Sequence, residues 1–276
     1  YLFKIFNIIK LDRDNIIIYL TFINLNPYIS RFYIAIPTII TDLILTLGFI
    51  MIIKNILSLK VKYPSTLIGF AISFASRQTS IALILSYLTS VFISKNRLFN
   101  KKLEISILIL FVIFSLLSIY YSNHTFDDPS ARAKLYSVNM RIFGIFFQDI
   151  SINQKVIFLI LPALSFGPIL LYFILFRSLK LKIKEIYKSN ILIFIISLIL
   201  IVILQPILSG PEISSRNIIR LTTLAYIPLV IFLVLITKNR VSFKAWYSIS
   251  LVLIFCFLHS LHPTFSKFKF FEFLKF

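Results

Sequence analysis

The sequence predicts an all-α protein, namely a polytopic transmembrane helical bundle that includes short broken or hairpin helices. Its composition points this way: 59% of the 276 residues are hydrophobic and 14% are charged, whereas soluble domains carry about 25% charged residues. The apolar residues form long separate runs, which is the pattern of membrane-spanning helices. The lysines and arginines stand between these runs, as they do in the cytoplasmic loops of membrane proteins.

The net charge of +19 comes from these lysines and arginines between the apolar runs. We expect the positive residues to set the topology and to contact anionic membrane lipids, and we expect no nucleic-acid partner. Cys256, the single cysteine, lies in an apolar run, which argues against a disulfide framework and a cysteine metal site. In this interpretation residues 1–276 are a single transmembrane domain. Because the first residue is Tyr1 rather than methionine, we expect an N-terminally truncated fragment.

The first segment, residues 1–30, mixes polar and apolar side chains and has no apolar run long enough to cross a bilayer. Asp12 and Asp14 interrupt any long helix within it. We therefore expect an outer-face segment with an amphipathic helix lying at the membrane interface. A spanning helix follows at residues 32–53, which runs inward and contains Asp42.

Residues 63–93 are apolar except for Arg77 and Gln78 near the middle. Basic clusters flank the stretch on both sides, so both of its ends should be cytoplasmic. As one helix it would be about 46 Å long, against a hydrocarbon core of roughly 30 Å. We expect two short helices folded as a hairpin, with Arg77 and Gln78 near the turn and toward the outer face.

The remaining apolar runs cross the membrane in alternating directions, the first of them outward. These predicted spans are residues 103–121, 156–176, 191–208, 221–236 and 245–261. Two outer loops separate them, at 122–155 and 209–219. In this topology most acidic residues fall at the outer side or within a span, and a functional site at the outer face would explain why they collect there.

The sharpest local motif is SRQTSI, residues 76–81. The guanidinium of Arg77 is a planar fork of donors that suits a phosphate or a carboxylate, and Gln78 adds an amide. The alternative is that Arg77 pairs with an intramembrane acid such as Asp42 and locks two helices together, because charges inside a membrane usually pair.

A second motif is the outer sequence DDPSAR, residues 127–132. Asp127 and Asp128 stand before Pro129 in a rigid polar turn. Their oxygens suit a divalent cation, or one of them acts as a general base. The alternative is a solvated turn in which Asp128 caps a helix. Arg132 ends this sequence and is a further candidate for substrate binding.

Arginines also gather at the predicted outer boundaries. Arg216 and Arg220, in SGPEISSRNIIR, are four residues apart and share one helical face. Their charge has the wrong sign for the dipole of a helix start, so a lipid phosphate or pyrophosphate is the expected partner. The alternative is snorkelling to ordinary headgroups. Arg31, in NPYISRFY, is another arginine at a predicted outer membrane boundary.

The sequence LDRD, residues 11–14, makes Asp12 and Asp14 candidate catalytic bases ahead of a spanning helix. His259 and His262 lack a third ligand in reach, so we expect polar residues at the membrane interface there and no metal site. The chain has no Walker loop, dinucleotide fingerprint, HExxH or GxSxG sequence. This disfavours nucleotide-driven transport and zinc or serine hydrolysis.

Residues 27–93 resemble the GT-C membrane glycosyltransferases. The resemblance rests on a hydrophobic run interrupted by RQT, after an outer NPxxxRxY segment. It is locally similar to the Alg10/DIE2 alpha-glucosyltransferase family, in which an FRQTN-like segment occurs; here it reads SRQTS, with Ser76 and Ser80 at the outer positions. The resemblance implies an aspartate or glutamate base in the first outer loop, where Asp12 and Asp14 stand, unless that base lies upstream of Tyr1.

The function implied by this resemblance is transfer of a sugar from a polyprenyl-phosphate donor to a lipid-linked or glycan acceptor at the outer or luminal face. The membrane would be a bacterial inner membrane or the endoplasmic reticulum, and the need for a divalent cation stays open. The residues alone support this weakly, since such a donor needs outer cations and a carboxylate base. A flippase or transporter of lipid-linked oligosaccharide or polysaccharide, or a polysaccharide polymerase, remains the alternative.

Overall fold

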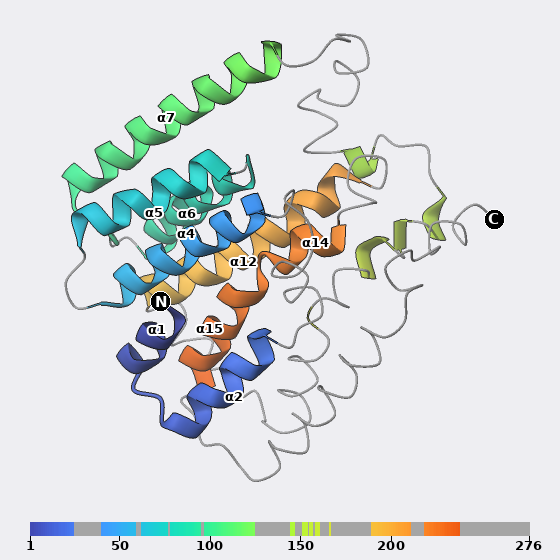
Figure 1. Ribbon diagram of the computed structural model, residues 1–276. Coiled ribbons are helices and arrows are strands. Elements are labelled where there is room, and N and C mark those ends of the chain that lie inside the picture. Colours follow the sequence, from blue (N-terminus) through green and yellow to red (C-terminus); the bar gives the residue numbers. More distant parts are fainter. Residues whose placement is uncertain are drawn as a thin grey trace.

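The structure is a computed structural model (Figure 1). It describes residues 1–24, 40–58, 62–76, 78–94, 97–124, 144–146, 151–153, 155–156, 158–160, 166, 189–210 and 218–237. The regular structure in these parts is entirely helical, so the predicted all-α class is confirmed there. The main helices are α1 (Leu2–Ile8), α2 (Arg13–Asn24), α4 (Ile40–Leu57), α5 (Tyr63–Ser76), the 3₁₀ turn η2 (Gln78–Ser80), α6 (Ile81–Ser94), α7 (Lys101–His124), α12 (Asn190–Ser209), α14 (Ile218–Thr223) and α15 (Tyr226–Thr237).

Two of the described helices, α4 and α12, are long and apolar enough to cross a membrane, judged by length and composition. The apolar helix Ile81–Ser94 is shorter. α12 coincides with the outward span expected at 191–208, and α7 coincides with the one expected at 103–121. α4 ends a little beyond the inward span expected at 32–53.

Polar residues define the ends of α7 and α12. Asn100 precedes α7, and its Oδ1 accepts a hydrogen bond of 2.9 Å from the backbone N–H of Leu103. Ser189 caps α12 in the same way, accepting from the N–H of Leu192. These side chains satisfy backbone donors that a helix start leaves without partners. Gly210 terminates α12 with a φ of 78°, a conformation that glycine adopts without strain.

Small residues bring α4 and α5 into close contact. A Cβ placed on Gly48 of α4 would lie 2.0 Å from Ser73 Oγ and 2.8 Å from the carbonyl oxygen of Gly69 on α5. A Cβ on Gly69 would in turn lie 3.0 Å from Ile52. The two backbones can approach this closely because neither glycine has a side chain. Further along, Asn55 Nδ2 donates to Ser65 Oγ at 2.9 Å.

α5 and α7 pack along each other in the same direction. Tyr63 at the start of α5 shares a hydrogen bond of 2.5 Å with Ser106 in the second turn of α7. Phe74 near the end of α5 contacts Phe111 and Phe114 further along α7, so these two helices are parallel. α6 follows η2, packs on α12 and leads back to the start of α7. The interruption expected in residues 63–93 is therefore present, between Ser76 and Ile81.

The described helices pack around a large apolar core, and a second, smaller cluster consists of Ile145, Phe158, Ile207 and Ile218. α5 packs on α4, α6 on α12, and α12 in turn on α14 and α15. Figure 1 shows α7 along one edge of this group, with α1, α2 and α15 on the other side. The fully buried aromatic side chains of the large core are Phe6, Tyr19, Phe49, Phe70, Phe194 and Tyr226.

The position of α1 corrects the expected topology of the N-terminal segment. Lys54 Nζ, in the last turn of α4, lies 5.0 Å from the centroid of the Tyr1 ring. The sequence analysis placed residues 1–30 at the outer face and Lys54 at the cytoplasmic side, on opposite sides of a membrane. The contact puts Tyr1 and Lys54 at the same end of α4, so both placements cannot hold. Cation–π attraction and the packing of α1 on α4 explain the difference.

The interruption expected near Asp12 is present, because α1 ends at Ile8 and α2 begins at Arg13, and Asp12 also caps the second helix. Asp12 Oδ1 accepts hydrogen bonds from the backbone N–H of Asn15 at 2.8 Å and from its Nδ2 at 2.6 Å. This is the geometry of a helix N-cap, and α2 starts at the following residue. Asp14 then lies in the first turn, where a negative charge favours the helix dipole.

The span expected at 221–236 is two helices in the structure. α14 ends at Thr223 and α15 starts at Tyr226, with the N–H groups of Leu224 and Ala225 bonded three residues back along the chain. Pro228 explains the interruption. A proline has no N–H to donate, and its ring collides with the carbonyl four residues earlier, here that of Leu224.

Several expectations concern residues outside the described parts. Within the loop 122–155 and the span 156–176 only short pieces are described, and apart from Ser151 the described residues within 144–166 are helical. The span at 245–261 and almost all of the loop at 209–219 lie outside.

Candidate functional site

Few of the residues expected to carry the function fall in the described parts. Asp12 and Asp14 are described in full, and Gln78 and Arg220 are described through their backbones, in η2 and α14. The remaining candidates lie outside the described residues: Arg31, Arg77, Asp127, Asp128, Arg132 and Arg216. Their proposed roles stay predictions.

Asp12 and Asp14 do not share a site with the α5–α6 break. Asp12 is bound to Asn15 as the cap of α2, and Asp14 is exposed in its first turn. Figure 1 shows α2 beginning far from the turn that joins α5 to α6. The sequence analysis treated both regions as neighbours at the outer face, and the structure separates them because α1 packs at the far end of α4.

The register of α4 against α5 shows what does lie level with the break. Asn55 lies opposite Ser65, Met51 and Ile52 lie opposite Gly69, and Gly48 lies opposite Ser73. The same antiparallel register, continued to the first turn of α4, brings Asp42 level with Gln78–Ser80. Figure 1 agrees, since α4 begins close to the turn between α5 and α6.

The first turns of α4 and the residues of η2 are polar and buried. Asp42 has no exposed surface, and Thr46, Thr79 and Ser80 are buried as well. Thr46 Oγ1 donates a hydrogen bond of 2.7 Å to the backbone oxygen of Asp42. The pairing of Asp42 with Arg77, which directly precedes η2 in the sequence, remains a prediction.

The break contains buried polar side chains as well as a change of backbone. The α-helical pattern gives way to a single 3₁₀ turn at η2. This turn lies level with the Asp42 carboxylate and carries the buried hydroxyls of Thr79 and Ser80. Such an arrangement can hold a polar group of a ligand at the end of an otherwise apolar helix pair.

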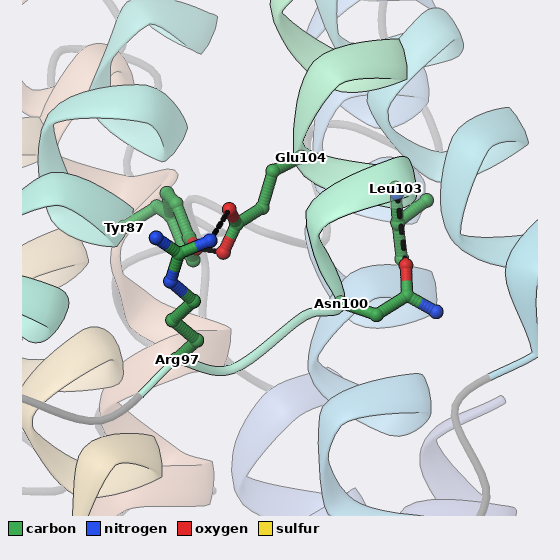
Figure 2. A network of polar contacts seen from close by, with 5 residues as sticks. All are labelled: Tyr87, Arg97, Asn100, Leu103 and Glu104. Atoms are coloured by element: carbon green, nitrogen blue, oxygen red, sulfur yellow. Dashed lines mark hydrogen bonds and ion pairs between the residues drawn. The ribbon is translucent and has the colours of Figure 1, made fainter.

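A second polar cluster lies where α6 turns into α7 (Figure 2). Arg97 Nη1 donates to Glu104 Oε2 at 2.9 Å, and the hydroxyl of Tyr87 donates to Glu104 Oε1. The Arg97 side chain is 57% exposed and that of Glu104 is 15% exposed. The ring of Tyr87 also stacks on Phe99, with 5.3 Å between the centroids.

The sequence analysis missed this cluster. It considered the region of Arg97 only as a basic cluster flanking residues 63–93, and it gave Tyr87 and Glu104 no role. One signal in the sequence could have predicted the ion pair. Asn100 caps α7 and so fixes where that helix begins, and Arg97 and Glu104 stand on either side of this cap. The contact with Tyr87 could not be found this way, since it depends on how α6 lies beside α7.

The described residues contain no group of three or more histidine, cysteine, aspartate or glutamate side chains that could hold a metal ion. The expectation of a divalent cation at Asp127 and Asp128 concerns residues outside that part of the chain. It therefore stays open.

The chain matches no protein-family model, no curated protein and no solved structure, and the resemblance of the segment around Gln78 to a glycosyltransferase family stays a prediction.

Proposed function

We propose that the protein is an integral, multi-pass membrane glycosyltransferase that moves a sugar from a polyprenyl-phosphate donor to a lipid-linked or glycan acceptor at the outer or luminal face. The observation that carries the proposal is the interrupted apolar helix at Gln78–Ser80, level with the buried carboxylate of Asp42. In a membrane, irregular backbone is tolerated only where protein buries it or where it lines a polar cavity.

The exposed surface of α7 supports a membrane environment. Its outward residues recur every three or four positions and are each close to half exposed: Ile105, Leu108, Ile109, Val112, Ile113 and Leu116. At about 1.5 Å per residue the helix is about 36 Å long, enough for a hydrocarbon core of roughly 30 Å. Water does not favour such a continuous apolar stripe, whereas lipid chains solvate it.

The contact between α4 and α5 also suits a membrane. Helices in lipid gain little from hiding apolar surface from each other, so they associate through small residues that let backbones meet. Gly48, Gly69 and Ser73 have this role. The close contact fixes the end of α5, and with it the position of the break, relative to Asp42.

The proposed roles of Arg77 and Asp42 at the break follow from their charges. Arg77 holds the phosphate of the donor, since a guanidinium stays charged and offers paired donors. A buried polar site strengthens such an interaction because water is excluded. Asp42 either supplies the negative charge that positions Arg77 in the absence of donor, or acts as the base that deprotonates the acceptor hydroxyl.

Transfer of labelled sugar from polyprenyl-phosphate donor in proteoliposomes tests the proposal. Arg77→Gln and Asp42→Asn should each reduce transfer at least tenfold, whereas Asp12→Asn should leave transfer nearly unchanged because Asp12 is the cap of α2. Arg77→Lys, which keeps the charge and loses the fork, should recover part of the activity. Full transfer by both Arg77→Gln and Asp42→Asn would remove the proposed site.

The second break, between α14 and α15, favours one alternative function. Transporters place substrate where two interrupted membrane helices face each other. The sequence analysis found only the break at Gln78–Ser80, but the structure also interrupts the chain at Leu224 and Ala225. A flippase for a lipid-linked oligosaccharide would use both breaks. Movement of labelled lipid-linked oligosaccharide across proteoliposomes, without any sugar transfer, would identify that function.

A further inference from the structure

A groove lies between α6 and α7. Its volume is about 760 Å³, within the range of roughly 300–1,000 Å³ that ligand pockets occupy. Apolar side chains form most of its lining, among them Leu88, Phe92 and Leu108. Phe92 is 85% exposed, and the other two are about half exposed. The groove therefore offers a long apolar surface that no described part of the chain covers.

One end of this groove is charged. Arg97 and Glu104 line it there, and Tyr87 lines it on the α6 side. Lys101 and Lys102, in the first turn of α7, are exposed next to this end. The described residues around the mouth thus carry three positive charges against the single carboxylate of Glu104. An occupant that complements both ends has an apolar chain and an anionic headgroup.

The hydrogen bonds at the mouth hold Arg97 in a position to bind such a headgroup. Glu104 is fixed by the hydroxyl of Tyr87 and binds Nη1 of Arg97. An arginine has five N–H donors, and more than half of this side chain is exposed. The guanidinium can therefore keep its bond to Glu104 while other donors face a phosphate. In this arrangement Glu104 and Tyr87 are positioning residues.

We propose that the groove between α6 and α7 binds one anionic phospholipid, with an acyl chain along Leu88, Phe92 and Leu108 and the phosphate at Arg97. Basic clusters at the ends of membrane helices attract anionic headgroups. The inference depends on the membrane placement in the proposed function, and it is independent of sugar transfer.

Native mass spectrometry of the purified full chain in detergent tests the binding. Phosphatidylglycerol and phosphatidylcholine with the same acyl chains are titrated separately. We expect phosphatidylglycerol to bind at least fivefold more tightly. Arg97→Gln should weaken phosphatidylglycerol about fivefold and leave phosphatidylcholine unchanged, and Arg97→Lys should retain the preference. Arg13→Gln, an exposed arginine on α2, is the charge control and should change neither lipid.

A larger side chain placed in the apolar part of the groove tests whether that part binds the acyl chain. Leu88→Trp should weaken both lipids strongly, whereas Leu200→Trp, at an equally exposed position on α12 outside the groove, should leave them unchanged. Thermal unfolding of every variant in the same detergent excludes misfolding as the cause of lost binding. A more conservative filling, Leu88→Phe, replaces the tryptophan variant if that variant unfolds.

Three outcomes would overturn the inference. They are equal affinity for the two phospholipids, equal loss for Leu88→Trp and Leu200→Trp, and tighter binding of polyprenyl phosphate than of phosphatidylglycerol. Extraction with alkaline carbonate separates these outcomes from a failure of the proposed function. A chain released by carbonate would contradict the membrane placement itself, whereas a retained chain without lipid preference would contradict only the groove.

Discussion

Two neighbouring helix pairs in the described part of the chain are held together in opposite ways. α4 and α5 meet backbone to backbone at Gly48 and Gly69, with no room for a methyl group. α6 and α7 meet through the ends of the side chains of Tyr87, Arg97 and Glu104, beside a groove of about 760 Å³. The two pairs are adjacent in the chain. They are also adjacent in space, because α5 of the first pair packs on α7 of the second.

The first pair has a fixed arrangement, whereas the second leaves space for a ligand. A close-packed pair has one arrangement, because small changes of volume at such a contact meet atoms that cannot move away. α4 and α5 can thereby keep the irregular backbone of Gln78–Ser80 level with Asp42. The pair of α6 and α7 leaves apolar and basic side chains exposed, so it can accept a molecule from its surroundings without moving the break.

The largest effect is expected where the backbones touch. In Gly48→Ala the new methyl group would meet Ser73 Oγ at 2.0 Å and the Gly69 carbonyl at 2.8 Å. Overpacking of this kind should lower the free energy of unfolding by about 3 kcal/mol, measured by denaturant unfolding in detergent. Leu47→Ala, at a half-exposed position on the same helix, is the control and should lose about 1 kcal/mol or less.

A second substitution sharpens this prediction. Ser73→Ala removes the Oγ that the methyl group meets first, while the Gly69 carbonyl remains. The double variant should therefore regain part of the stability that Gly48→Ala loses, giving an interaction energy of about 1 kcal/mol. If Gly48→Ala were no less stable than the Leu47 control, the contact between α4 and α5 would not be close, and the contrast between the pairs would fail.

A smaller effect is expected at the other pair. Glu104→Leu removes the acceptor of the Tyr87 hydroxyl as well as the partner of Arg97. Leaving a partly buried hydroxyl without an acceptor should lower the free energy of unfolding by about 1–2 kcal/mol. Glu104→Gln keeps an acceptor oxygen and should lose about half as much. A loss from Glu104→Leu greater than that from Gly48→Ala would reverse the proposed order of the two pairs.

The break in residues 63–93 could be predicted because it follows from length and from the charge at the two ends. Neither requires knowledge of what packs against the helices. The ends of α7 and α12 likewise follow from Asn100 and Ser189, whose side chains cap them locally. The break before α15 also had a local signal, Pro228, whose missing N–H acts four residues upstream; the sequence analysis did not use it.

The site was harder to predict because its parts are distant in the sequence. Asp12 is a carboxylate like Asp42, but it caps a helix that packs at the far end of α4. Asp42 is level with Gln78–Ser80 only because two glycines set the register of α4 against α5. The sequence analysis had considered Asp42 as a partner of Arg77, but nothing in the chain order shows that register.

The smallest effect on stability is expected for Arg97→Gln. The side chain is 57% exposed, and an exposed ion pair stabilises a fold by about 0–1 kcal/mol. The change in unfolding free energy should therefore stay below about 1 kcal/mol in dilute buffer. It should shrink further at 1 M salt, where charges are screened within about 3 Å. Denaturant unfolding of wild type, Arg97→Gln and Arg97→Lys at both salt concentrations measures this.

A loss above about 2 kcal/mol would show that Arg97 holds α6 to α7, as the glycines hold α4 to α5, and the two pairs would then no longer differ in kind. A small, salt-sensitive loss has a different consequence. Because the folded structure would then be indifferent to the guanidinium, its exposed position beside an apolar groove needs another cause, and an anionic headgroup supplies one.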